Sequence, residues 1–185
     1  ADALLTKIST ALQGTEQESG LAPLIIGGEN NYTRFLRPRL ERLFSAVSVR
    51  DDAAAIEAAG KIAGCGMGLT PSSDDLLCGY FLTLRLLLSR QDRAQEDRFI
   101  KRMAQAAAER TNRISGTFLL QSGEGLANAA VYILLRVAGR PSEAETVDRA
   151  IQRILEIGST SGADMLTGIA LALRQQYGGT NSDQI

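Results

Sequence analysis

Apolar residues recur at intervals of three and four along most of the chain. Near the start they fall at Leu4, Leu5, Ile8 and Leu12, and a glycine follows two residues later. This spacing places apolar side chains on one face of an α-helix, and glycine commonly follows a helix end. Similar patterns predict further helices over residues 30–49, 53–63, 72–89, 97–110, 126–137, 142–156 and 161–177.

The sequence lacks the strict alternation of apolar and polar residues that is typical of half-buried strands. We therefore predict an all-α single domain of seven or eight helices, with at most a small β element near the N-terminus. That element would lie in residues 21–28, an apolar run that fits either a short strand or a buried turn. Pro38 marks a start, a break or a kink within the helix of residues 30–49.

The order of these segments suggests three parts. Residues 1–50 form an N-terminal helical segment, residues 51–177 a helical core, and residues 178–185 a disordered tail. A charged turn over residues 90–96 separates two helices of the core. The 185 residues suffice for one domain with a buried core.

Charge and composition exclude several classes of partner. The 20 lysines and arginines nearly balance 21 acidic residues, so no basic field attracts nucleic acid. No apolar run is long enough to span a membrane, and no signal peptide is visible. Cys65 and Cys78 do not have the spacing of metal ligands. We expect a cytoplasmic protein that binds neither nucleic acid nor membrane.

The sequence contains no histidine. A Ser-His-Asp or Cys-His catalytic group is therefore excluded, as is the usual histidine-based zinc site. Any proton transfer must use Asp, Glu, Lys, Tyr, Cys or the ligand itself. Cys65 is a candidate nucleophile, but it has no histidine to activate it.

A glycine-rich segment over residues 64–75 leads into the helix of residues 72–89 and includes its first turn. Such a loop brings backbone N–H groups close to a ligand, and its three alternating glycines are more than helix capping requires. Ser72 or Ser73 is the natural N-cap. The candidate ligand-binding residues are Gly64, Gly66, Gly68, Thr70, Ser72, Ser73 and Asp74.

A second loop and helix repeat this pattern without a gap: residues 161–174 match residues 72–85. Asp75 matches Asp164, and Gly79 matches Gly168. Glycine within a helix costs about 1 kcal/mol relative to alanine, so we expect a close helix–helix contact at both glycines. The two helix N-termini would then face one pocket. We take Asp75 and Asp164 as catalytic candidates and add Ser159 and Ser161 to the ligand-binding set.

The residues leave the chemistry of this pocket open. Each serine and aspartate has a simpler role as a helix cap or first-turn acid. As a ligand site, Asp74 and Asp75 would either hold Mg²⁺ against a phosphate or accept hydrogen bonds from amide or urea N–H groups. No cofactor is certain, and Mg²⁺ is the only candidate. Thr117, Ser122 and Glu124 flank a third break in the helices. They either form turns and helix caps there or complete the pocket.

Residues 66–79 resemble the signature of a bacterial family long described only as a domain of unknown function. Its members include the H subunit of oxamate carbamoyltransferase, an enzyme of allantoin breakdown. Residues 158–168 resemble the family's C-terminal signature, and the likeness extends over residues 54–177. Family members are longer, which implies that residues 1–50 are the remainder of a larger N-terminal portion.

The resemblance implies a subunit of a hetero-oligomeric carbamoyltransferase that converts oxalurate and phosphate into oxamate and carbamoyl phosphate. Its partners would be other subunits and a small anionic metabolite: carbamoyl phosphate, oxalurate, oxamate or phosphate. Such chemistry relies on positioning and charge stabilisation. Two alternatives are a non-catalytic assembly subunit and a Mg²⁺-dependent enzyme with a phosphate ligand.

Overall fold

The computed structural model describes residues 2–15, 18–87, 93–138 and 140–178, and all regular structure within these ranges is helical. The predicted all-α class is confirmed. The helices are α1 (Asp2–Leu12), α2 (Pro23–Ile26), α3 (Asn31–Ser48), α4 (Asp52–Ile62), α5 (Ser72–Leu87), α6 (Arg93–Ala108), α7 (Arg113–Gly123), α8 (Ala129–Val137), the 3₁₀ helix η1 (Pro141–Glu143), α9 (Ala144–Leu155) and α10 (Ser161–Tyr177).

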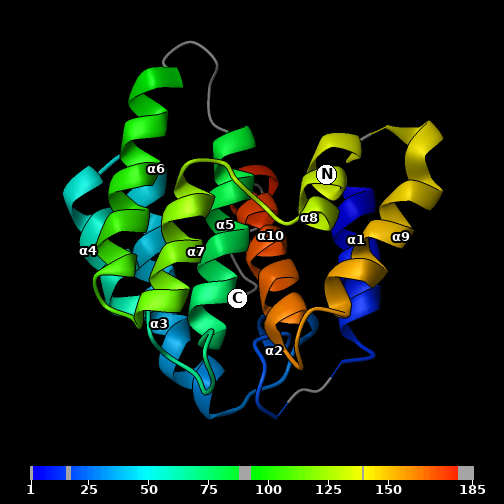
Figure 1. The fold of residues 1–185 in the computed structure, drawn as a ribbon, viewed down its shortest axis with the longest axis horizontal. Helices are drawn as coiled ribbons and strands as arrows, with labels where there is room; N and C mark the ends of the chain where they lie inside the picture. Colours follow the sequence, from blue (N-terminus) through cyan, green and yellow to red (C-terminus); the bar gives the residue numbers. More distant parts are fainter. Residues whose placement is uncertain (1, 16–17, 88–92, 139, 179–185) are drawn as a thin grey trace.

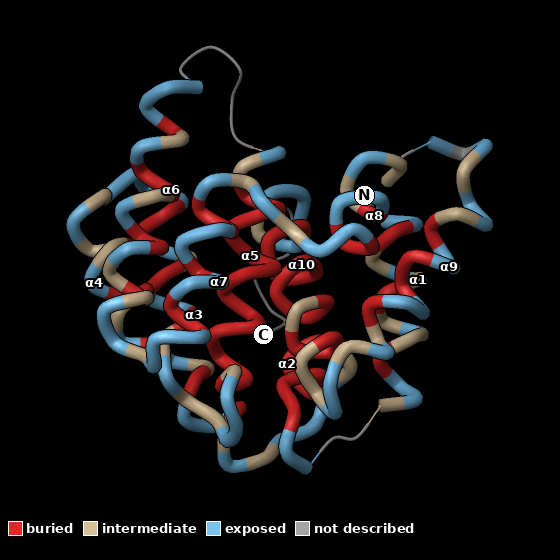
Figure 2. Tube along the Cα trace, in the orientation of Figure 1, coloured by how far each residue is buried: buried red, intermediate tan, exposed pale blue. Residues whose placement is uncertain are grey.

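Helices α5 and α10 lie side by side at the centre of the molecule (Figure 1). Helices α3, α4, α6 and α7 lie on the α5 side, and α1, α8 and α9 lie on the α10 side. Buried positions concentrate on the central pair (Figure 2). A helix that is apolar around most of its circumference must be covered on several faces, and α5 is buried from Ser72 to Leu84.

The central helices touch through their glycines. A Cβ atom on Gly79 would lie 2.1 Å from the carbonyl oxygen of Met165, and one on Gly168 would lie 1.9 Å from that of Leu76. No larger residue fits without a backbone shift, because real Cβ contacts are not that short. The close contact expected at both glycines is therefore present. It sets α5 and α10 in parallel register, with both N-termini at the same end of the molecule (Figure 1).

Local sequence explains where several helices begin. Asn30 and Thr33 form a reciprocal capping box at the start of α3. The Asp51 side chain caps α4 by accepting the N–H of Ala54 at 3.0 Å. Helix α3 continues through Pro38 without a break.

The structure differs from the sequence prediction in three details. Within the described residues there are ten α-helices, because the run near Leu24 forms the short helix α2 and residues 113–123 form α7. No strand occurs in the described part of 21–28 or elsewhere in the described residues. Neither Ser72 nor Ser73 caps α5, since the helix starts at Ser72 and the Pro71 carbonyl accepts the N–H of Asp75 at 3.3 Å.

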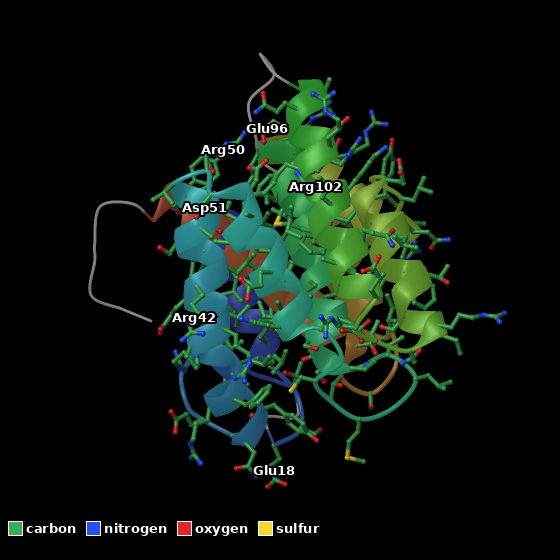
Figure 3. All side chains as sticks on the ribbon, turned by 90° about the vertical axis from the view of Figure 1, so that its left-hand side faces the viewer. Glu18, Arg42, Arg50, Asp51, Glu96 and Arg102 are labelled. Atoms are coloured by element: carbon green, nitrogen blue, oxygen red, sulfur yellow. The ribbon has the colours of Figure 1, made fainter. Side chains whose placement is uncertain are left out.

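An ion pair joins the α3–α4 junction to α6. The guanidinium of Arg50, a residue with φ of 60°, donates to both carboxylate oxygens of Glu96, one of them at 2.7 Å. Figure 3 shows the two labelled side chains close together at one end of the molecule. The predicted end of a helix at residue 89, most of the tail of residues 178–185 and part of the charged turn over residues 90–96 lie outside the described residues.

Candidate functional site

The glycine-rich loop folds around the carboxylate of Asp74. This side chain is fully buried and accepts hydrogen bonds from the Gly64 N–H at 2.7 Å and the Ser115 hydroxyl at 2.7 Å. The hydroxyls of Ser73 and Thr111 also donate to it. Four donors thus satisfy both oxygens of Asp74, and the residue ties the loop to α7 and to the segment preceding it.

Positive φ and close backbone neighbours explain two of the loop glycines. Gly64 has φ of 80°, and a Cβ there would lie 2.8 Å from the Arg110 carbonyl oxygen. Gly66 has φ of 133°, and a Cβ there would lie 2.4 Å from the Ser72 nitrogen. Both positions favour glycine because φ is positive and a neighbouring backbone atom leaves no room for a Cβ atom. Gly68 also has positive φ, at 91°, but its Cβ position faces open space.

Asp75, the next residue, points to a different side of α5 and lines a cavity of about 450 Å³. The residue is 6% exposed, and within the described part of the chain its Oδ2 atom has no hydrogen-bond partner. The hydroxyls of Thr70 and Ser161 lie beside its carboxyl and lower its pKa. These two hydroxyls also lie 3.1 Å from each other, so residues from both glycine loops meet at Asp75.

Burial raises the pKa of Asp75 from 3.8 to about 7. The hydrogen bond from Ser161 lowers the pKa, the nearby Asp164 carboxylate raises it, and smaller effects come from Thr70 and Asp74. Desolvation dominates because a charged carboxylate loses water that the surrounding groups only partly replace. A carboxyl group with a pKa near 7 can both give and take a proton at neutral pH.

The cavity is lined by α5, α7 and α10, by the glycine loop before α5, and by the segments before α8 and α10. Its polar groups are neutral apart from Asp75, and its remaining surface is apolar. The lining residues are Thr70, Asp75, Cys78, Phe118, Gln121, Ser122, Leu126, Ala127, Asn128, Ile157, Ser161 and Met165.

Asp164 lies near Asp75 but does not line this cavity. The residue is fully buried, and its Oδ1 accepts the N–H of Leu21 at 2.6 Å. Asp164 therefore holds the segment before α2 against the start of α10. Its effect on the cavity is electrostatic, because it raises the pKa of Asp75.

The other predicted residues fall into two groups. Thr70 and Ser161 line the cavity, and so does Ser122, whose hydroxyl donates to the Leu119 carbonyl. The rest do not line it: Gly64, Gly66, Gly68, Ser72, Ser73, Asp74, Thr117, Glu124 and Ser159. Ser73 accepts the Cys65 N–H at 2.8 Å within the loop, and Ser159 is exposed.

Neither cysteine has the properties of an activated nucleophile. Burial raises the pKa of the Cys65 thiol, with the Asp74 carboxylate as a smaller contribution in the same direction. Burial also raises the pKa of Cys78, which lines the cavity. A raised pKa keeps a thiol protonated, and the protonated form is a poor nucleophile.

The residues present do not fit a Mg²⁺ ion bridging Asp74 and Asp75. Both oxygens of Asp74 already accept hydrogen bonds from the loop and α7. Among the described residues, no group of three or more acidic or cysteine side chains has the arrangement of a metal site. The remaining hypothesis for Asp75 is hydrogen bonding to amide or urea N–H groups.

Several lining residues were not predicted from the sequence. Gln121 and Phe118 lie on α7, which was not recognised as a helix. Asn128 precedes an apolar run, a pattern that indicates an N-cap, and its side chain does accept the Ala130 N–H at 2.8 Å. Because that bond occupies its oxygen, Asn128 has an amide N–H₂ group for other partners.

Fold and cavity together define an all-helical protein in which two parallel central helices bring their N-terminal turns to one small cavity. Residues 62–173 match the family described as oxamate carbamoyltransferase subunit AllH. This match covers more than half of the chain, and the chain belongs to that family. The family suggested by the sequence signatures is confirmed. No solved structure matches the chain, and no helix in the described residues is long and apolar enough to cross a membrane.

Proposed function

We propose that this protein is a subunit of an oxamate carbamoyltransferase and that its cavity at Asp75 binds the carbamoyl or ureido end of the substrate. The observation that carries the proposal is the buried Asp75 carboxyl in a neutral polar cavity. A carboxylate oxygen without a partner among the described residues is suited to a ligand N–H donor. Family membership supplies the reaction class.

The neutral groups around Asp75 complete a site for an amide-like ligand. The hydroxyls of Thr70 and Ser161 and the amides of Gln121 and Asn128 line the same cavity. Hydroxyl and amide donors stabilise a carbonyl oxygen as negative charge develops on it during attack. The apolar part of the lining lowers the local dielectric constant, which strengthens these interactions.

In the proposed reaction, a phosphate oxygen bonds to the carbamoyl carbon of oxalurate. The bond from that carbon to the oxamate nitrogen breaks, and the nitrogen takes up one proton. Protonated Asp75 donates this proton to the nitrogen. The attacking phosphate gives up its own proton to Asp75, which returns the carboxyl group to its protonated form. The products are carbamoyl phosphate and oxamate, as in the pathway of allantoin breakdown. The pKa of about 7 suits Asp75 to both directions of transfer.

The test uses the chain assembled with the other subunits of the enzyme. We expect Asp75→Asn to lower kcat for oxamate-dependent phosphate release from carbamoyl phosphate by about 10²–10⁴-fold. Asp148→Asn is the matched control, because Asp148 is exposed on α9, pairs with Lys7, and does not line the cavity. Full activity of the Asp75→Asn enzyme would overturn the proposal and favour the role of an assembly subunit.

A further inference from the structure

Five exposed apolar side chains lie on the glycine loop, on α7 and in the segment before α8, and two of them, Phe118 and Leu126, line the cavity. They are 49–81% exposed, and we call them the apolar rim: Met67, Leu69, Ile114, Phe118 and Leu126. Water-exposed apolar side chains are common singly, but a contiguous group beside a site indicates contact with another protein.

Hydrogen bonding, helix spacing and the shared cavity link Leu69, Ile114, Phe118 and Leu126 of this rim. The Asn112 side chain donates to the Leu69 carbonyl at 3.0 Å, which fixes the glycine loop to the start of α7. Ile114 and Phe118 lie one turn apart on the outer face of that helix. Phe118 and Leu126 also line the cavity, so the rim continues directly into the site.

No lysine or arginine among the described residues lines the cavity behind the rim. Asp75 and the Cys78 thiol are the only titratable groups among the described residues that line it. Asp74 on α5 and Asp164 on α10 add negative charge behind Asp75. Oxamate, oxalurate and carbamoyl phosphate are all anions, and carboxyl groups near the cavity would repel them in their ionised forms unless a cation is added.

We propose that another subunit of the carbamoyltransferase packs on the apolar rim and places a lysine or arginine side chain at the cavity mouth opposite Asp75. The inference rests on the proposed function, because the missing charge matters only if the cavity holds an anionic substrate.

Two observations favour a different subunit over a second copy of this chain. The family is described as a subunit of the enzyme, which implies other subunits as partners. A second copy would bring the same apolar rim and the same acidic cavity to the contact, and it would supply no cation from the lining residues. A partner with an apolar segment and a basic side chain is complementary in both respects.

The first test measures assembly. We expect Leu69→Asp and Leu126→Asp to weaken association with the co-purified partner subunits at least 100-fold in analytical ultracentrifugation, because each places a charge in a desolvated contact. Val49→Asp is the matched control, since Val49 is 72% exposed at the end of α3, outside the rim. All three substitutions are at exposed positions, and circular dichroism checks their folding. Unchanged association of both rim variants would overturn the proposal, as would a homodimer of the chain alone that these variants dissociate.

The second test detects the partner's cation by counting the protons released when the subunits associate. Before the anionic substrate binds, a positive side chain beside Asp75 favours its charged form, so association near pH 7 should release protons from the wild-type chain. The bound anion then offsets this cation and returns the pKa of Asp75 toward the value that the proposed reaction uses. Calorimetry in two buffers of different ionisation enthalpy counts these protons. We expect Asp75→Asn to associate but to release measurably fewer protons. Equal proton release by the wild type and Asp75→Asn would contradict the proposal that a partner cation lies beside Asp75. Full turnover by Asp75→Asn would contradict the proposed function. The two failures are therefore distinguishable.

Discussion

Gly79 faces the carbonyl oxygen of Met165 so closely that a Cβ atom on the glycine would lie 2.1 Å from that oxygen. Gly168 makes the reciprocal contact with Leu76. These contacts hold the starts of α5 and α10 together and thereby bring Thr70 to Ser161. The geometry of the cavity therefore depends on two positions that carry no functional group.

The first prediction concerns these glycines. Alanine has the better helix propensity by about 1 kcal/mol, but overpacking against a backbone costs about 1–3 kcal/mol or more. We expect Gly79→Ala and Gly168→Ala each to lower the free energy of unfolding by roughly 2 kcal/mol, measured by urea denaturation. Gly14→Ala is the control, because its Cβ would make an ordinary contact at 3.8 Å. Equal stability of the three variants would contradict the packing described for α5 and α10.

The second prediction concerns Asp74. Replacement by alanine leaves the Gly64 N–H and the hydroxyls around it without their acceptor. We expect Asp74→Ala to destabilise the fold by about 3 kcal/mol or more, and Asp74→Asn to cost less because its amide oxygen can still accept. Thermal unfolding measures both variants. Asp148→Asn, at an exposed site, should change stability by less than about 0.5 kcal/mol.

The third prediction is a pH dependence of stability. The pKa of Asp75 is about 7 in the folded protein and near 3.8 when unfolded. Between these values the folded state binds the proton more tightly, so the contribution of Asp75 to stability falls as the pH rises from about 4 to 7. The whole shift corresponds to a change on the order of 4 kcal/mol.

Asp75→Asn removes this titration while keeping the shape of the side chain. We expect the variant to gain stability over the wild type as the pH is raised from 5 to 8, measured by urea denaturation at each pH. A constant difference between the two proteins would show that Asp75 does not titrate in this range.

The fourth prediction separates two serines of the second loop. The Ser161 hydroxyl lowers the pKa of Asp75 by hydrogen bonding to its carboxyl. Ser161→Ala should therefore raise that pKa by roughly half to one unit, measured by ¹³C NMR titration of the carboxyl group. Ser159 is exposed and does not line the cavity. Ser159→Ala should leave the titration unchanged, and a similar shift in both variants would contradict this placement.

The sequence predicted the central features of the fold because they are encoded locally. Apolar periodicity gives the helices, and the gapless match between residues 72–85 and 161–174 pairs Gly79 with Gly168. Glycine inside an apolar helix already indicates a close contact. Helix α2 is too short for periodicity to distinguish it from a strand.

The roles of the three aspartates could not be separated in this way. Asp74 and Asp75 are adjacent, but successive residues on a helix point about 100° apart, so one faces the glycine loop and the other faces the cavity. Asp164 matches Asp75 in the repeat, yet its backbone partner Leu21 is 143 residues away in sequence. Only the packed structure shows which carboxyl is bonded internally and which lines the cavity.

The bond between Leu21 and Asp164 has a consequence for dissecting the chain. The boundary suggested at residue 51 would remove Leu21, together with α1, which packs against α10. A fragment starting there would contain both glycine loops. It would expose the apolar face of α10 that α1 covers, and the fully buried Asp164 would lose its hydrogen bond from the Leu21 N–H. The segment that precedes the family match is thus a structural support for Asp164 and the start of α10, and fragments without it are poor material for ligand-binding studies.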